Sequence, residues 1–130
     1  MDQEQLHRIQ AALRRFVVGG LFNVVSQTCE NPGTLNLADI RELKSDPPPF
    51  VEMRFKPPKH HLRIFGRFIC KDGLILTSLA MKSPQGARSR KSLDVREELK
   101  RCDDFFRGQG FDLNWCPATI EASITNAKII

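Results

Sequence analysis

The chain of 130 residues, 41% hydrophobic and 27% charged, has the composition of one globular domain, which excludes disordered and collagen-like proteins. Its 20 lysines and arginines against 15 acidic residues give a net charge of +5, and this excess favours an anionic partner. No run approaches the roughly 18 apolar residues of a membrane span, and the polar opening Met1–Gln10 predicts no signal peptide, so we expect a cytoplasmic protein without membrane association.

The first 49 residues are predicted to be mainly helical. Apolar residues recur at helical spacing across Leu6–Phe16 and are followed by Gly19, which predicts an amphipathic helix that ends there. Leu21–Cys29 predicts a second, shorter helix, and Leu35–Leu43 predicts a further helical turn. Pro47–Pro49 imposes an extended entry into the next segment, with a ligand for an SH3-type domain as the alternative.

Three segments with period-two alternation predict an antiparallel sheet over residues 50–82. They are Phe50–Phe55, Leu62–Cys70 and Leu74–Lys82. Asp72-Gly73 lies between the last two and predicts a type I′ turn. Counting back from this turn places Arg63 opposite Lys82.

In this register one face of the sheet collects cations. That face holds Arg54, Arg63, Arg67 and Lys82, with Phe65 among them, while Leu62, Ile64 and Phe68 lie on an apolar face. A shift by one residue would bury the arginines, so the register is well specified. Four cations on one face of a basic protein predict a phosphate-binding surface.

The segment after the sheet continues the basic character. Residues 82–91 contain Lys82, Arg88, Arg90 and Lys91 but no acidic residue. Such a loop is either an arm that contacts phosphate or a solvated tether, and its position beside the basic face favours the arm.

The remaining residues predict one long helix and a tail. Ser92 can cap a helix over residues 92–107, whose apolar stripe runs from Val95 to Phe106. The tail, residues 111–130, forms a short helix or an added edge strand. The order of elements predicts a single α+β domain with a small antiparallel sheet of three or more strands, two N-terminal helices and one C-terminal helix.

The spacing of cysteines and acidic residues predicts no metal site. The four cysteines, Cys29, Cys70, Cys102 and Cys116, form no C-x-x-C pair. We expect reduced, mostly buried thiols, with a disulfide or a zinc site as the alternative. Because no H-E-x-x-H motif or paired acidic site occurs, we expect no metal or other cofactor.

Several short motifs between Ile40 and Arg107 resemble one toxin family. The motifs are Ile40–Lys44, Phe50–Arg54, Leu62–Phe65, Asp72–Leu76 and Met81–Lys82. Their order resembles the RelE/HigB-like toxins of toxin–antitoxin modules, a group within the RelE/ParE superfamily. In that family an aromatic-glutamate-leucine-arginine segment precedes a hairpin whose final strand ends in lysine.

The resemblance implies a RelE-like fold and a metal-independent endoribonuclease that cleaves mRNA on the ribosome. It also implies a cognate antitoxin as partner. By position, Arg54 and Arg63 match the strand arginines of the family, and Lys82 matches its lysine. The chain departs from the family because it opens with a helix and has no tyrosine. A non-catalytic nucleic-acid-binding module and a protein-interaction module are therefore the alternatives.

Metal-free RNA cleavage requires a proton-transfer group and cations that stabilise the charged phosphorus centre. His61 shares strand parity with Arg63 and is the candidate for proton transfer, with an exposed loop histidine as the alternative. Arg63 and Lys82 are the candidates for charge stabilisation. We therefore predict His61, Arg63 and Lys82 as catalytic residues.

A second group of residues is predicted to bind the substrate. It consists of Arg54, Phe65, Arg67, Arg88, Arg90 and Lys91. In this group Arg54 grips a phosphate and Phe65 offers a stacking surface for a base. The alternatives are an ion pair between Arg54 and Glu52, and a Phe65 side chain covered by the C-terminal tail in a second core.

Overall fold

The computed structural model describes residues 3–35, 37–47, 49–55, 62–81 and 87–130, without the side chains of residues 81 and 87–94. In chain order the elements are α1 (Gln3–Val17), β1 (Phe22–Val25), α2 (Pro32–Leu35), β2 (Ile40–Leu43), β3 (Phe50–Arg54), β4 (Leu62–Cys70), β5 (Gly73–Met81), α3 (Ala87–Gly108), the 3₁₀ helix η1 (Ile120–Ser123) and β6 (Ala127–Ile129). No helix within these residues is long and apolar enough to cross a membrane.

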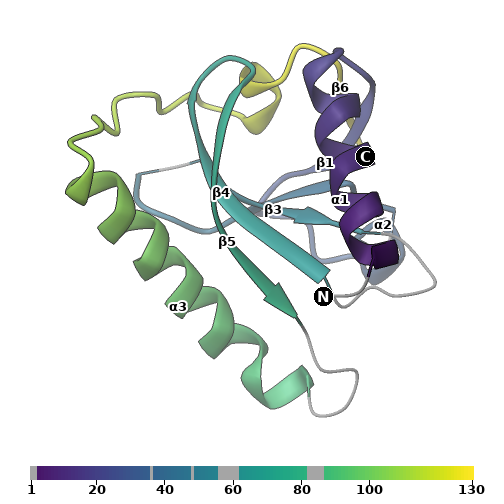
Figure 1. The fold of residues 1–130 in the computed structure, drawn as a ribbon, viewed down its shortest axis with the longest axis horizontal. Helices are drawn as coiled ribbons and strands as arrows, with labels where there is room; N and C mark the ends of the chain where they lie inside the picture. The colour runs from purple at the N-terminus through teal and green to yellow at the C-terminus, as the bar shows by residue number, and fades with distance from the viewer. Residues whose placement is uncertain (1–2, 36, 48, 56–61, 82–86) are drawn as a thin grey trace.

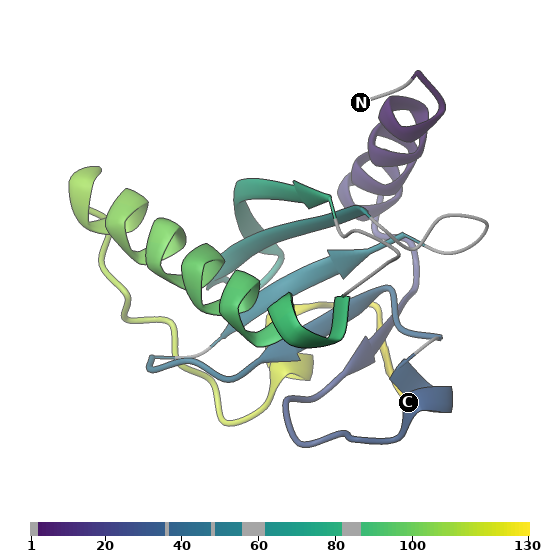
Figure 2. The ribbon, with the colours of Figure 1, turned by 90° about the horizontal axis from the view of Figure 1, so that it is seen from below.

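A six-stranded mixed sheet forms the centre of the fold. Its strand order is β5-β4-β3-β2-β1-β6. β1 runs parallel to both β2 and β6, whereas β2, β3, β4 and β5 pair antiparallel in sequence order. Figures 1 and 2 show α1 and α3 on opposite sides of this sheet.

Each face of the sheet has its own apolar core. On one face, Met53 and Ile64 pack against the α1 residues Ile9 and Ala12. On the other face, Phe50 and Phe65 pack against Cys102 and Phe106 of α3, which are fully buried. Both faces are therefore covered by a helix, and burial of these two apolar layers drives the assembly.

The predicted α+β class is confirmed, but the predicted RelE-like arrangement is wrong. Leu21–Cys29 does not form a helix: its Phe22-Asn-Val-Val segment forms β1, because β-branched residues buried between two parallel neighbours favour a strand. Leu35–Leu43 likewise contains the end of α2 and the whole of β2. The predicted sheet thus lacked β1 and β2.

Other expected elements are present. The first helix and the three strands within residues 50–82 are confirmed, and the long C-terminal helix begins at Ala87 rather than at Ser92. The tail contains both of the expected alternatives, a short helix (η1) and an edge strand (β6) that pairs with β1.

The predicted register of the β4–β5 hairpin is wrong. Cys70 pairs with Gly73 and Arg63 pairs with Ala80, so the tight turn is centred on Lys71 and Asp72. Asp72 itself adopts a positive φ of 59°, which aspartate tolerates better than most residues, and its carboxylate accepts hydrogen bonds from Thr125. A tertiary contact thus fixes the turn one residue earlier than the local sequence predicts.

An irregularity in the middle of the hairpin also changes which side chains face which helix. The pairing shifts between Phe65 and Gly66, so that Gly66 lies opposite Leu76. As a result Leu76 packs in the core beneath α1 and Ile75 packs in the core beneath α3, whereas unbroken alternation from the Asp72-Gly73 turn predicts Ile75 on the face of Ile64 and Leu76 on the face of Phe65. One extra residue in a strand produces this inversion.

Candidate functional site

Three arginines surround one glutamate on the sheet face that is turned toward α3. The sheet register pairs Arg41 with Glu52 and Arg54 with Arg63, which places all four side chains on that face. The Glu52 Oε1 atom lies 4.0 Å from Arg41 Nη1, 3.8 Å from Arg54 Nε and 3.9 Å from Arg63 Nε. We call these three arginines with Glu52 the arginine cluster.

The three guanidinium groups of the arginine cluster share one carboxylate. The three guanidinium groups and one carboxylate sum to +2, and all three ion pairs are longer than a hydrogen bond. The side chains are 21% (Arg41), 11% (Arg54), 4% (Arg63) and 3% (Glu52) exposed. Burial of a charged group costs free energy unless the group is paired, so an anion that reached the buried Arg41 Nε would stabilise that side chain.

Burial is the main influence on the ionisation of the cluster. Desolvation lowers the pKa of Arg54 and of Arg63, the Glu52 charge opposes this effect, and neighbouring guanidinium groups lower both pKa values further. Arginine nevertheless remains protonated at neutral pH because its unperturbed pKa is so high. The cluster is therefore a fixed concentration of positive charge.

Backbone carbonyls orient two of the guanidinium groups. Arg54 Nη1 donates to the carbonyl of Leu35 at 2.9 Å, and Arg63 Nη1 donates to the carbonyl of Leu62 at 3.0 Å. Arg41 Nε is buried and has no hydrogen-bond partner within the described part of the chain. A buried donor of this kind calls for an acceptor, and a phosphate or carboxylate oxygen would supply one.

Arg67 and Phe65 do not belong to an open surface, contrary to the sequence prediction. The Arg67 side chain is 1% exposed and donates to Asp103 Oδ1 from Nε (3.1 Å) and Nη2 (2.8 Å). Phe65 stacks on Phe50 with ring centroids 5.9 Å apart. Because α3 covers this part of the face, neither side chain is accessible to RNA.

The covering of this face follows from the apolar stripe of α3. A helix whose stripe runs from Val95 to Phe106 needs an apolar partner, and Phe50 and Phe65 provide it. The apolar stripe of α3 was the sequence signal for this cover, because the neighbours of Phe65 on its own strand face are Arg63 and Arg67. The alternative of a second core is thus the correct one, although α3 rather than the C-terminal tail forms its cover.

Several predicted site residues are not described. His61 and Lys82 lie outside the described residues, and so do the side chains of Arg88, Arg90 and Lys91. Of the residues predicted from sequence, the structure brings Arg54 and Arg63 together. It adds Arg41, which sequence reasoning missed because Ile40–Leu43 was assigned to a helical turn.

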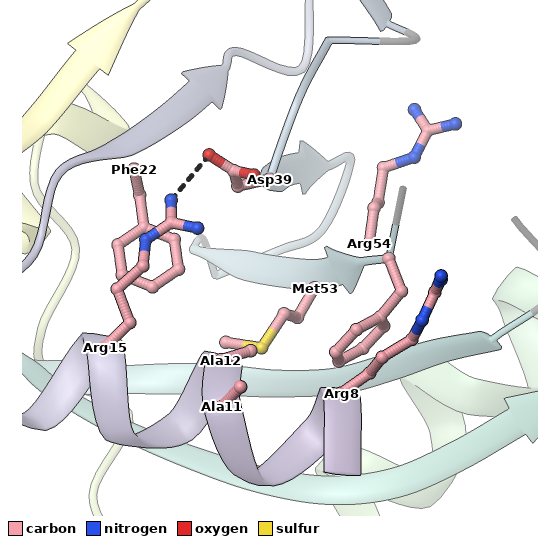
Figure 3. Close-up of a pocket in the computed structure, with 9 residues that line it drawn as sticks. Arg8, Ala11, Ala12, Arg15, Phe22, Asp39, Met53 and Arg54 are labelled. Atoms are coloured by element: carbon pink, nitrogen blue, oxygen red, sulfur yellow. Dashed lines mark hydrogen bonds and ion pairs between the residues drawn. The ribbon is translucent and has the colours of Figure 1, made fainter. Parts of the chain in front are cut away.

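A pocket of about 290 Å³ lies on the other side of Arg54, between α1 and the sheet (Figure 3). Arg54 is part of its wall, and Arg8 and Arg15 reach it from α1. Arg15 donates to Asp39 Oδ2 at 2.9 Å, and its guanidinium lies 4.0 Å above the Phe22 ring. Arg15 is thus held in place, whereas the Arg54 side chain points from the end of β3 away from α1 (Figure 3).

The thiols and acidic groups offer no alternative site. Cys102 is buried, Cys29 is partly buried, and Cys70 and Cys116 are exposed, so the expectation of mostly buried thiols is wrong. All four cysteines are free. Among the described residues, no three histidine, cysteine or acidic side chains are placed to hold a metal ion.

No protein-family model matches this chain, and no curated protein or solved structure matches it either. The geometry and charge of the site therefore provide the basis for the proposed function.

Proposed function

We propose that this domain binds single-stranded RNA and that the arginine cluster holds one of its phosphates. The observation that carries the proposal is the convergence of three guanidinium groups within 4.0 Å of a single carboxylate oxygen, with Arg41 Nε buried and lacking a hydrogen-bond partner among the described residues. The overall charge of +5 supports the same class of ligand. RNA is chosen over other polyanions because the short motifs between Ile40 and Lys82 resemble those of RelE/HigB-like toxins, whose substrate is mRNA, although the arrangement of the sheet differs.

A phosphodiester fits the chemistry of the arginine cluster. Its two unesterified oxygens accept hydrogen bonds from the planar fork of a guanidinium group. Its negative charge reduces the excess positive charge, and one oxygen satisfies the buried Arg41 Nε. Arg41 and Arg54 are the more exposed members, so they make the first contact with the strand.

Salt-dependent binding tests the proposal. Binding of a labelled single-stranded RNA is measured by fluorescence anisotropy at several salt concentrations, for the wild type, Arg41→Ala and the control Arg107→Ala. Arg107 is an exposed arginine at the end of α3, so the control removes the same charge elsewhere. We expect Arg41→Ala to weaken binding about tenfold or more and to flatten the salt slope by about 0.7. Equal affinities for the two variants contradict the proposal.

Cleavage of mRNA in the cytoplasm, under the control of an antitoxin, is the second candidate. The observation in its favour is the direct pairing of Arg54 with Arg63 across β3 and β4, since two adjacent guanidinium groups can stabilise a phosphorane-like transition state. Purified protein is incubated with RNA alone and with translating ribosomes. We expect Arg54→Ala to slow cleavage at least tenfold. RNA binding without any cleavage refutes this candidate and leaves the first one standing.

A further inference from the structure

A second and larger pocket lies where three separate segments of the chain meet. These segments are the end of α1, the turn between β4 and β5, and the link between η1 and β6. Figure 1 shows them close together at the top of the view. The pocket has a volume of about 660 Å³, which is within the range of small-molecule sites. We call it the turn pocket, and none of the four residues of the arginine cluster lines it.

Hydrogen bonds between the three segments fix the walls of the turn pocket. The Asp72 carboxylate accepts from the amide of Thr125 at 2.8 Å and from the Thr125 hydroxyl, and the amide of Asp72 donates to the carbonyl of Ser123 at 2.8 Å. These bonds join the β4–β5 turn to the link. The side-chain amide of Asn126 donates to the carbonyl of Gly19, which joins the link to α1. The walls are therefore preformed, as they are in most ligand sites.

The wall of the turn pocket is largely apolar and partly open to solvent. Each of the three segments contributes apolar side chains, among them Phe16, Leu74 and Ile124. Val17 and Val18 also line the pocket, and they are 82% and 75% exposed. Exposed apolar side chains beside a pocket are typical of binding sites, because transfer of an apolar ligand group from water onto such a wall is favourable.

The polar groups of the turn pocket are mainly hydrogen-bond acceptors. The Asp72 carboxylate is ionised at neutral pH, since the hydrogen bonds from Thr125 lower its pKa. They occupy two of the roughly four acceptor positions of a carboxylate, so Asp72 can accept from a further donor. The side-chain oxygen of Asn126 is another acceptor, and α1 ends at Val17 with the negative pole of the helix.

The charge of the turn pocket is opposite to that of the whole protein. Among its described lining residues, Asp72 has the only charged side chain. The cations that adjoin these segments in sequence, Arg15 and Lys71, do not line the pocket, and Arg15 is bound to Asp39. The chain as a whole carries +5, which attracts anions. The turn pocket therefore favours a cation where the overall field of the protein does not.

We propose that the turn pocket binds a small organic cation in which one ammonium group is joined to an apolar ring. The ring packs against the apolar wall, and the ammonium group donates to the Asp72 carboxylate. One carboxylate matches one positive charge, which favours a monocation over a polyamine. This site lies outside the arginine cluster, so the proposal does not depend on RNA binding.

The test compares three indole compounds of similar shape and different charge. Tryptamine carries an ammonium group, tryptophol has a neutral hydroxyl in its place, and indole-3-acetate carries a carboxylate. Calorimetric titration of the full chain at pH 7 and low salt gives each affinity. We expect tryptamine to bind about tenfold more tightly than tryptophol and indole-3-acetate to bind most weakly. Equal affinities for tryptamine and tryptophol, or tighter binding of indole-3-acetate, overturn the proposal.

Variants of Asp72 locate the ammonium group. Asp72→Asn keeps a residue that suits the turn and removes the charge, so it should lower the affinity for tryptamine to that for tryptophol and leave tryptophol binding unchanged. Asp104→Asn is the matched control, because it removes an exposed carboxylate from α3, outside the pocket. A preference for tryptamine that persists in Asp72→Asn, or that Asp104→Asn also abolishes, overturns the proposal.

A variant of the exposed valines locates the ring. Val17→Thr combined with Val18→Thr keeps the shape of both side chains and makes the wall more polar. We expect it to weaken the binding of tryptamine and tryptophol alike, by about threefold or more. Leu37→Thr is the control, because Leu37 is exposed and does not line the pocket. Unchanged affinities in the valine variant, or an equal loss in Leu37→Thr, overturn the placement of the ring.

A second copy of the chain is the other occupant that the exposed Val17 and Val18 would suit. Sedimentation velocity over a range of protein concentrations tests for it. A monomer at every concentration, together with tryptamine binding, supports the ligand site. A dimer that the valine variant dissociates, with no binding of tryptamine, assigns the turn pocket to a second copy and overturns the proposal.

Discussion

Removal of the Asp103 carboxylate is expected to destabilise the domain strongly. Asp103 lies on α3 and accepts two hydrogen bonds from Arg67, whose side chain is 1% exposed. Arg67 also donates to the carbonyl of Pro47. Asp103→Ala leaves a guanidinium group buried between α3 and the sheet without its anionic partner.

The expected loss of unfolding free energy follows from the burial of Arg67. Removal of one partner from a buried ion pair costs roughly 3–5 kcal/mol, and the Asp103 side chain is 20% exposed, so water reaches the pair and the lower value of about 3 kcal/mol applies. With an unfolding entropy of about 2.1 cal/mol/K per residue, a 130-residue domain loses about 11 °C in melting temperature. This is a large part of an ordinary stability of about 5–15 kcal/mol.

Thermal and urea unfolding monitored by fluorescence of Trp115 measure this loss. Trp115 is the single tryptophan of the chain, it packs against the core beneath α1, and its Nε1 donates to Ser123 Oγ at 2.9 Å. Asp104→Ala is the matched control, because it removes an exposed carboxylate from the next position of α3.

A double replacement tests whether the unpaired charge of Arg67 causes the loss of stability. Arg67→Met combined with Asp103→Leu removes both charges and keeps apolar bulk, so it should recover most of the lost stability. A cost below about 1 kcal/mol for Asp103→Ala, or an equal cost for Asp104→Ala, would refute the view that this pair fixes α3 on the sheet.

Three further predictions concern the hairpin and the buried thiol. Hydrogen bonds from the hydroxyl and the amide of Thr125 lower the pKa of Asp72. At pH 7 the wild type should therefore be more stable to unfolding than Asp72→Asn, by less than about 1 kcal/mol because the carboxylate is exposed. This difference in stability should disappear as the pH falls below about 3.9, the unperturbed value, and then through the lowered pKa of Asp72. Urea unfolding curves of the two proteins that still differ at pH 2 would contradict this prediction. A Cβ at Gly66 would lie 2.1 Å from the Ile75 carbonyl oxygen, so Gly66→Ala should lower the free energy of unfolding by about 3 kcal/mol or more. A variant that unfolds at the same temperature as the wild type would be inconsistent with this close packing. Burial raises the pKa of the Cys102 thiol, so a thiol reagent at pH 7 should modify the two exposed cysteines first and Cys102 only on denaturation. Rapid labelling of Cys102 in the folded protein would show instead that α3 opens readily.

Long periodic segments were predictable from the sequence, whereas short buried strands were not. The stripes of α1 and α3 and the alternation of β4 extend over many residues, so one helical or strand period dominates. β1 and β2 have four residues each, too few to distinguish a buried strand from a helical turn by period. Their partners lie far away in the sequence, and pairing with those partners decides their structure.

The candidate site was predictable only in part, for the same reason. The period-two pattern placed Arg54 and Arg63 on one face of the sheet correctly. The contribution of Arg41 depended on β2, and the burial of Phe65 depended on the packing of α3. Sequence alternation specifies which side chains share a face, but it does not specify which element covers that face.

The most direct test of phosphate binding by the arginine cluster is the NMR spectrum of arginine Nε–Hε groups during titration with a single-stranded RNA. The account predicts that the resonances of Arg41, Arg54 and Arg63 shift together with one midpoint, while that of Arg67, which is bound to Asp103, stays in place. Cluster resonances that do not move at saturating RNA would contradict the account.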